Sequence, residues 1–508
     1  MGKQMRDLEY LLRYVRTGTT EGDRTFLSKV FISPDELTKL TAIEQGGMRI
    51  LVANKGMGKT AIAEWINDRS GKRSVPCILL RPDDLDTSEL GDAHDIGTLK
   101  RHFFTTLVTA AAAAIGSQLS GLLVGDATTL HTAARREGMA AADRVQKGLA
   151  LLSAISVATG GINGKKLAEE LTGTPHPNDL IRAINSELLA PGKVMFLLID
   201  DTDQVASPTE PSHLNRIWAL LLAVRKLATD CTSVRPIVTL RTEVWVRLIS
   251  ESAGQRDQAD HLRGSVVRLR ATDDMMGKII RRRLEIASKD AGKTTNDYYA
   301  NFFDSKLVTL PGSVEERRWD SFIIKSSRER PRDALQLIRN MIDQCGPRVE
   351  KITSVEAEKA MDIYSKERVD DLVNEFSADC LSIREVTRTF TDINFEADFE
   401  ILRKHLKSIP SRFSLTIRGK LMKPDNEDDA VSLLSLLHET GFLNPRVPDT
   451  TATRQFAHIL FADDPHFVKM SNWNNMQAAR WEVHPAFRSW LISEQKSSLT
   501  RTLIGRKP

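Results

Sequence analysis

The stretch over residues 48–65, "MRILVANKGMGKTAIAEW", constrains the fold of this 508-residue chain more than any other segment. An apolar run, MRILVA, is followed by a glycine-containing turn and then by the helix-forming run TAIAEWINDRS. A short apolar run that ends in such a turn is typical of a buried strand. The segment therefore predicts a strand, a tight loop and a helix in direct succession.

The loop carries residues that bind phosphate at the start of a helix. Backbone N–H groups and the helix dipole attract phosphates, a lysine reaches the outer ones, and a Ser or Thr hydroxyl binds magnesium. Lys59 and Thr60 fit the last two roles, and Gly56 and Gly58 allow the turn. Ala53 replaces the first glycine of the motif, and a chance Gly-Lys-Thr is the alternative interpretation. The residues expected to surround an ATP molecule are Asn54, Lys55, Gly56, Met57, Gly58, Lys59, Thr60 and Ala61.

Further short apolar runs follow along the chain, with helical segments between them. They are VPCILLRP (75–82), VMFLLIDD (194–201), RPIVTLRT (235–242) and SVVRLRA (265–271). LNRIWALLLAVRKLA (214–228) is one of the intervening helices. Short apolar strands that alternate with helices predict an α/β fold with a parallel, doubly wound sheet.

The run VMFLLIDD ends in two adjacent carboxylates, Asp200 and Asp201. A buried strand that delivers acids to its carboxyl end suits a magnesium-nucleotide site at that edge of the sheet. We assign Asp200 to Mg²⁺ and Asp201 to the attacking water. A strand end followed by the polar turn DDTD is the alternative. Asp in place of the longer Glu is compatible with slow hydrolysis, or with a switch that stays ATP-bound.

Two arginine-containing segments are candidates for sensing the γ-phosphate. In IVTLRTEVW, either Thr239 or Arg241 could lie between the acidic pair and the phosphate. The alternative, to which we give equal weight, is that Arg241 is an ordinary arginine at the end of a strand. In RERPRDALQLI, Arg332 follows Pro331 at a predicted helix start, where it could couple nucleotide state to domain angle. A solvated charge in the first turn is the alternative for Arg332.

The order of these motifs resembles the AAA+/STAND type of P-loop ATPase, near its origin-recognition-like branch. The resemblance covers about residues 30–345 and extends to bacterial ATPases of anti-phage defence systems. It implies a P-loop NTPase parallel sheet, a large helical insertion, a helical lid and a mainly helical, winged-helix-like C-terminal domain. It also implies a Mg²⁺-dependent ATP hydrolase in which Lys59, Arg241 and Arg332 act on the phosphates and Asp201 acts on the attacking water.

The expected domain organisation follows from these assignments. We expect an N-terminal helical segment over 1–45, an ATPase core over 46–272 with an insertion at about 83–190, a lid over 273–350, a winged-helix-like domain over 351–495 and a flexible tail over 496–508. In the last domain, LLSLLHETGFL (433–443) predicts a helix and turn, and WEVHPAFRSWL (481–491) a strand and helix.

The insertion contains two runs without charged residues, 102–125 and 148–164. Each approaches the length of a membrane helix, but both are rich in Ala, Gly, Ser and Thr, with Gln118 and Asn163 inside. Small residues suit close helix packing. We favour a packed, oligomerising helical hairpin over membrane contact.

Composition excludes few function classes. The 71 basic and 67 acidic residues leave a net charge of +4, too little to indicate nucleic acid binding by itself. Four scattered cysteines and no CxxC pair indicate neither a zinc site nor a disulfide framework, and no signal peptide is evident, so a cytoplasmic location is expected.

Three hypotheses for function follow. The first is an ATP-controlled homo-oligomer that acts with a separately encoded effector in phage defence. The second is a DNA-binding initiator-like or helicase-loader-like ATPase, and the third is a nucleotide-binding scaffold with little turnover. The basic run KIIRRRLEIASK (278–289) fits either a phosphate-backbone patch or an arginine finger, from Arg282 or Arg283, for a neighbouring subunit.

Overall fold

The computed structural model describes residues 6–16, 20–42, 46–85, 95–119, 123–137, 139, 176–204, 213–250, 256–449 and 456–504. The chain divides into two compact units. We call them the sheet unit, which comprises Ser33–Ala53 and Lys59–Leu269, and the C-terminal unit, which comprises Met1–Ile32, Asn54–Gly58 and Arg270–Pro508.

The sheet unit is built on a five-stranded parallel sheet with the order β2-β3-β4-β1-β5. Its strands are β1 (Arg49–Ala53), β2 (Cys77–Leu80), β3 (Met195–Ile199), β4 (Val234–Arg241) and β5 (Val266–Arg268). All five predicted strands are present, and the predicted α/β parallel fold is confirmed. Because β4 lies between β1 and β3, its carboxyl end separates the glycine loop after β1 from the acidic pair after β3.

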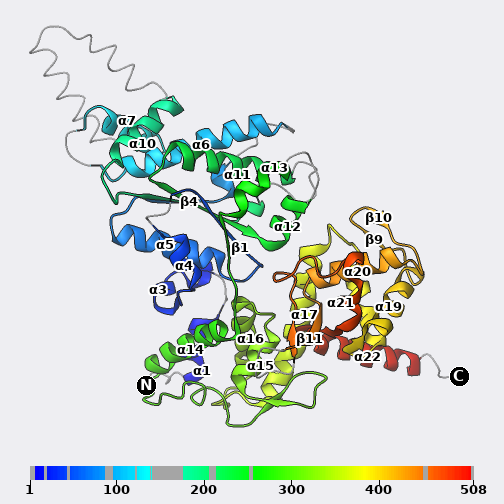
Figure 1. Cartoon of the computed structure of the whole chain (residues 1–508). Coiled ribbons are helices and arrows are strands. Elements are labelled where there is room, and N and C mark those ends of the chain that lie inside the picture. The colour runs from blue at the N-terminus through cyan, green and yellow to red at the C-terminus, as the bar shows by residue number, and fades with distance from the viewer. Residues whose placement is uncertain are drawn as a thin grey trace, which may run out of the picture. The chain divides into compact units, whose positions relative to one another are not determined.

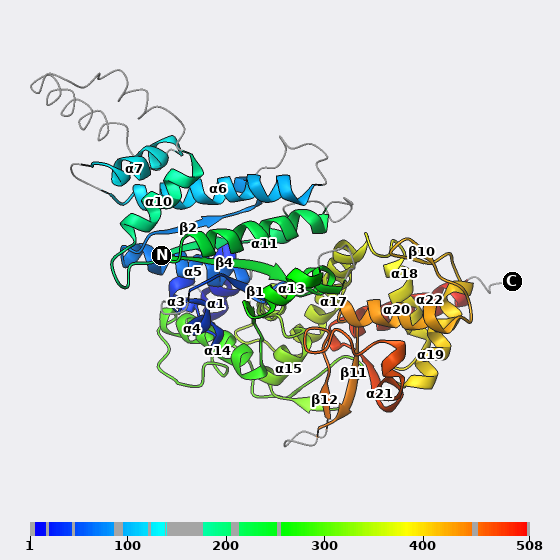
Figure 2. The same cartoon turned by 45° about the horizontal axis from the view of Figure 1, so that its top comes forward.

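Helices cover both faces of this sheet, which is why its central strands are apolar throughout. In Figures 1 and 2, α6 (Ile96–Gly116) and α11 (His213–Asp230) lie over one face, and α5 (Lys59–Lys72) lies over the other. The remaining elements of this unit are α4 (Glu36–Leu40), η1 (Pro82–Leu85), α7 (Asp126–Arg136), α10 (Pro177–Glu187), η3 (Thr202–Gln204), α12 (Thr242–Ser250) and α13 (Arg256–Arg263).

The weakly polar run 102–125 forms most of α6, which packs against α7 and α11 inside the sheet unit. Its four alanines at 111–114 are buried, and a Cβ atom on Gly116 would come within 2.0 Å of the Leu130 carbonyl oxygen of α7. The small residues therefore serve close helix packing, as predicted. In the part of the chain that the structure describes, no helix combines the length and apolarity needed to cross a membrane. The run 148–164 lies outside the described residues.

The C-terminal unit is mainly helical and has one continuous apolar core. Its first half contains α1 (Asp7–Val15), α2 (Thr20–Asp23), α3 (Leu27–Val30), α14 (Asp273–Asp290), β6 (Val308–Thr309), β7 (Glu316–Arg317), α15 (Trp319–Ser326), α16 (Pro331–Asp343) and α17 (Ser354–Phe376). Tyr14 of α1 donates a hydrogen bond to Asp290 of α14 at 2.6 Å, so the N-terminal helix belongs to this unit.

The second half of this unit surrounds a four-stranded antiparallel sheet with the order β12-β11-β13-β8. Its elements are α18 (Ile383–Arg388), η4 (Thr389–Asp392), β8 (Glu396–Asp398), α19 (Phe399–Ser408), η5 (Ile409–Ser411), β9 (Thr416–Ile417), β10 (Lys420–Leu421), α20 (Glu427–Glu439), β11 (Leu443–Pro448), β12 (Phe456–His458), η6 (Met470–Asn472), α21 (Trp473–Ala478), β13 (Arg480–Val483) and α22 (Pro485–Ile504). The predicted helix and turn at 433–443 and strand and helix at 481–491 correspond to α20 and β13–α22.

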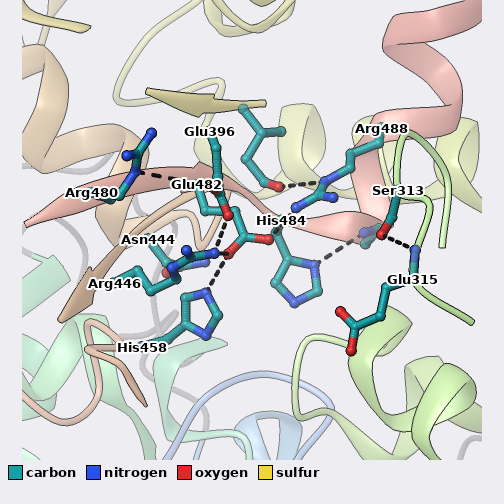
Figure 3. Close-up of polar contacts among 12 residues, drawn as sticks. Ser313, Glu315, Glu396, Asn444, Arg446, His458, Arg480, Glu482, His484 and Arg488 are labelled. Atoms are coloured by element: carbon teal, nitrogen blue, oxygen red, sulfur yellow. Dashed lines mark hydrogen bonds and ion pairs between the residues drawn. The ribbon is translucent and has the colours of Figure 1, made fainter. Parts of the chain in front are cut away.

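One face of this antiparallel sheet carries a polar network centred on Glu482 of β13 (Figure 3). His458 contacts the Glu482 carboxylate at 2.7 Å, and Arg488 of α22 donates to it. Burial would raise the pKa of Glu482, but the hydrogen bond from His458 and the charge of Arg488 lower it to about 2. The network therefore holds an ionised carboxylate that ties β12 and β13 to α22.

Candidate functional site

The glycine loop joins β1 to α5 and contains Asn54, Lys55, Gly56, Met57 and Gly58. Gly56 and Gly58 have φ angles of +81° and +92°. These values lie in the left-handed region, where a Cβ atom is strained and glycine is not. The loop thus needs glycine at both positions, and it delivers the chain directly to the N-terminus of α5.

Ala53 is accommodated because it is the last residue of β1 and not part of the turn. It is 2% exposed, pairs in register with Arg241 of β4, and has no positive φ angle. An extended, tightly packed position needs a small residue but not glycine. The replacement that weakens the motif in the sequence therefore leaves the geometry of the loop intact.

Lys59 is the first residue of α5, and its side chain turns back to the loop. The Lys59 Nζ donates to the Ala53 carbonyl at 3.0 Å, and the residue is 8% exposed. Burial lowers the pKa of this ammonium group, while the negative charges of Asp203 and Glu243 act in the opposite direction. Thr60 and Ala61 follow in the first turn of α5, both half-buried.

Thr239 of β4 connects the two acids that follow β3. Its hydroxyl donates to Asp200 Oδ1 at 2.5 Å and accepts from the Asp201 backbone N–H at 3.2 Å. Its own carbonyl accepts from the Thr202 hydroxyl at 2.5 Å. A single β4 residue therefore orients both carboxylate-bearing positions.

The donor set fits a magnesium ion that is shared with a nucleotide. Asp200 is fully buried, and its Oδ2 has no hydrogen-bond partner among the residues that the structure describes. Such an orphaned carboxylate oxygen is expensive unless a cation or water meets it. The described residues contain no group of three or more acidic, His or Cys side chains that could hold a metal. Mg²⁺ typically takes one or two protein ligands and completes its shell with water and phosphate oxygens.

Asp201 combines backbone strain with an unusual pKa. Its φ angle is +51°, a conformation that costs energy in a non-glycine residue and recurs at functional sites. Burial first, and then the charges of Asp200 and Asp203, raise its pKa to about 6, while Lys59 and Arg241 lower it. The two neighbouring acids therefore disfavour the ionised form of Asp201.

The raised pKa of Asp201 predicts the stability of an Asp201→Asn variant. An acid whose folded pKa lies above its unfolded value destabilises the fold at pH values above the folded pKa, and this cost vanishes below the unfolded pKa. In EDTA without nucleotide, Asp201→Asn should therefore be more stable than wild type by about 1 kcal/mol near pH 8, a figure reduced for solvent screening. The difference should shrink as the pH falls through about 6 and disappear below about pH 4. Urea unfolding between these pH values measures the free energy of unfolding of both proteins. Equal stability at about pH 8 would contradict the raised pKa of Asp201.

The two sensor candidates on β4 have different partners. Thr239 contacts the acidic pair, whereas Arg241 Nε lies 2.7 Å from Asp203 Oδ2. Asp203 and Glu243 are the residues near this site that sequence reasoning missed, since the turn DDTD was treated only as a polar alternative. Asp203, the third acid of that turn, is only 6% exposed. It is recognisable as a residue of the site only once the pairing of β3 with β4 is known.

Arg332 is the second residue of α16 in the C-terminal unit, to which the loop residues Asn54–Gly58 also belong. Its backbone N–H donates to the Gly56 carbonyl at 3.4 Å. In the same unit, Lys55 pairs with Glu375 of α17 at 3.0 Å, and Met57 packs against the apolar core. The predicted lid helix and the predicted loop are therefore in contact.

The basic helix α14 does not present Arg283 as an arginine finger. Arg283 is 6% exposed, forms an ion pair with Asp23 and donates to the Tyr14 carbonyl. Arg282 donates to the Lys29 carbonyl at 2.8 Å and pairs with Glu285 at 3.0 Å. The prediction of an arginine finger from Arg283 is wrong, because its guanidinium group is buried and paired with Asp23 within the C-terminal unit.

Comparisons with known proteins match part of this architecture. Residues 274–373 match the family of the FunZ-associated C-terminal helical domain, which corresponds to the segment from α14 into α17. A search among curated proteins finds no match. The family match covers too little of the chain to assign the whole of it.

Solved structures of origin-recognition proteins are similar over most of the chain. The Aeropyrum pernix ORC2 protein in ADPNP and ADP complexes is 8% identical, with a TM-score of 0.36 and coverage of 95% of each chain. Drosophila ORC bound to DNA is 12% identical, with a TM-score of 0.28 and coverage of 92% of this chain and 93% of that one. At such scores these similarities carry no argument about activity. The function must be argued from the chain's own residues.

Proposed function

We propose that this chain is a Mg²⁺-dependent ATPase that uses ATP as a switch. The observation that carries the proposal is the position of the Thr239 hydroxyl. It hydrogen-bonds both the Asp200 carboxylate and the Asp201 backbone N–H, and Thr239 lies on β4, which pairs with β1, the strand that leads into the glycine loop. Lys59 at the start of α5 and the acid pair after β3 both belong to the carboxyl edge of the parallel sheet, and the two conformationally demanding glycines precede Lys59 in the chain. Ligands of open α/β sheets bind outside the carboxyl ends of the strands.

In this proposal each residue has a separate task. The loop N–H groups and the α5 N-terminus hold the phosphates, and Lys59 leaves the Ala53 carbonyl to neutralise the β- and γ-phosphates. Thr60 and Asp200 hold Mg²⁺, which supplies charge neutralisation on the phosphate oxygens when bound. Asp201 orients the attacking water and accepts its proton. The short Asp201 side chain makes slow turnover the expected behaviour.

The switch would act through the contacts that the loop makes with α16 and α17. The Gly56 carbonyl accepts from the Arg332 N–H, and Lys55 pairs with Glu375. A change of loop conformation on phosphate binding would therefore alter the contacts of α16 and α17. We propose that Arg332 reports the nucleotide state and that the state controls assembly of a homo-oligomer.

Action with a separately encoded effector in bacterial anti-phage defence, in the cytoplasm, follows from the family resemblance and belongs to the same proposal. Nucleic acid is the alternative partner.

Magnesium dependence tests the proposed site directly. Wild type should hydrolyse ATP with Mg²⁺ and lose the activity in EDTA. Asp200→Asn should raise the half-saturating Mg²⁺ concentration at least about tenfold, because one of the few protein ligands loses its charge. Asp68→Asn is the matched control, since this acid lies on the exposed face of α5 in an ion pair with Lys72 at 2.5 Å. An unchanged Mg²⁺ requirement in Asp200→Asn would refute the metal assignment.

A further inference from the structure

Asp203 is a buried carboxylate to which the proposed chemistry gives no task. It lies in η3, directly after the acidic pair, and is 6% exposed. Its Oδ2 lies 2.7 Å from Arg241 Nε, and its Oδ1 has no hydrogen-bond partner within the described part of the chain. A buried carboxylate is costly unless it is paired, so the direct contact with Arg241, together with the nearby charge of Lys59, offsets that cost.

The partner, Arg241, ends β4 at the edge where the candidate site lies. It pairs in register with Ala53, whose carbonyl accepts the Lys59 ammonium group. Its side chain is 25% exposed, in contrast to the buried acid that it contacts. A guanidinium group is a rigid planar fork, so fixing its Nε edge also fixes the direction in which the rest of the fork extends.

We propose that Asp203 is a positioning residue that orients Arg241 toward the γ-phosphate and thereby sets the preference of the site for ATP over ADP. The inference rests on the proposed ATP site and deepens it. ADP lacks the group that Arg241 would meet, so only the triphosphate gains from a correctly aimed guanidinium. Without Asp203, Arg241 keeps its charge but loses its direction, and the ATP-specific gain is lost.

The sign of the change separates positioning from simple electrostatics. If Asp203 acted only as a negative charge near the phosphates, its removal would favour the more highly charged nucleotide, and the preference for ATP would rise. A positioning role predicts the opposite, because the preference would fall. The measured quantity is therefore the ratio of the Kd for ADP to the Kd for the non-hydrolysable analogue AMP-PNP, each with Mg²⁺.

The experiment is a double-mutant cycle on the full chain, read by calorimetric titration. Arg241→Ala should lower the ratio about tenfold, as expected for one charge-assisted hydrogen bond. Asp203→Asn should lower it by a similar factor, and the double variant should lower it no further. Asp230→Asn should leave it unchanged, because this acid pairs with Lys226 at the end of α11.

The outcomes distinguish this inference from the proposed function. If wild type binds neither nucleotide, both fail. If wild type binds AMP-PNP and the ratio in Asp203→Asn is unchanged or raised, only the positioning role fails. Should Asp203→Asn not fold, Arg241→Lys decides, since it keeps the charge without the guanidinium fork. A lowered ratio in this variant supports positioning, and a wild-type ratio overturns it.

Discussion

Lys59→Ala should abolish nucleotide-dependent activity. ATP hydrolysis should fall about 10³-fold, because the variant removes the ammonium group that is expected to neutralise the outer phosphates while charge develops there. Binding of AMP-PNP should weaken at least about 100-fold, as expected when a buried ammonium loses several charge-assisted hydrogen bonds. Steady-state phosphate release and calorimetric titration measure the two effects.

Lys72→Ala is the matched control for this experiment. Lys72 ends the same helix, α5, but pairs with Asp68 on the surface, where its side chain is 65% exposed. This variant should keep wild-type hydrolysis and binding. If wild type hydrolyses ATP no faster than Lys59→Ala, the chain is not an ATPase, and a nucleotide-binding scaffold becomes the better description.

The parallel sheet could be predicted from the sequence because its signals are local. Each of the five strands is a short apolar run that ends at a turn or a polar residue, and such runs are recognisable without tertiary information. The loop between β1 and α5 is equally local, since Gly56 and Gly58 mark the turn that their positive φ angles require.

The hydrogen bonds and the ion pair around the acids that follow β3 could not be predicted from the sequence in the same way. The role of Thr239 depends on β4 lying beside β3, and the pairing of Asp203 with Arg241 joins residues far apart in the sequence. Strand order is a property of the whole sheet, so Thr239 and Arg241 could not be distinguished before the topology was known. Burial then explains why Asp203, which resembles a turn residue in the sequence, is not solvated.

The lid motif Pro-Arg-Asp-Ala-Leu shows a different limit of sequence reasoning. Attention falls on Arg332, but the next residue, Asp333, is the buried one, with 2% exposure. It accepts from Arg368 of α17 at 2.7 Å and pairs with Arg328 at 3.0 Å. Both partners belong to segments whose proximity the motif itself does not reveal.

Replacing Asp333 should therefore cause the largest loss of stability among the changes considered. Asp333→Ala leaves the side chains of Arg328 and Arg368, which are 5% and 4% exposed, without their shared carboxylate. Removing one partner of a buried ion pair typically costs about 3–5 kcal/mol. Urea unfolding followed by the fluorescence of Trp319 and Trp490, which are both buried in the C-terminal unit, should show a correspondingly lower midpoint.

The pH dependence of this loss identifies its cause. Burial would raise the pKa of Asp333, but the charges of Arg328 and Arg368 outweigh it and lower the pKa below its ordinary value. Such an acid stabilises the fold above its unfolded pKa and loses this contribution as the pH falls through the folded pKa. The difference between wild type and Asp333→Ala should therefore be full near neutral pH and shrink in strong acid. Asp343→Ala, at the exposed end of α16, should cost at most about 0.5 kcal/mol at any pH. A similar cost in both variants would show that the helix, and not the buried charge network, is what Asp333 stabilises.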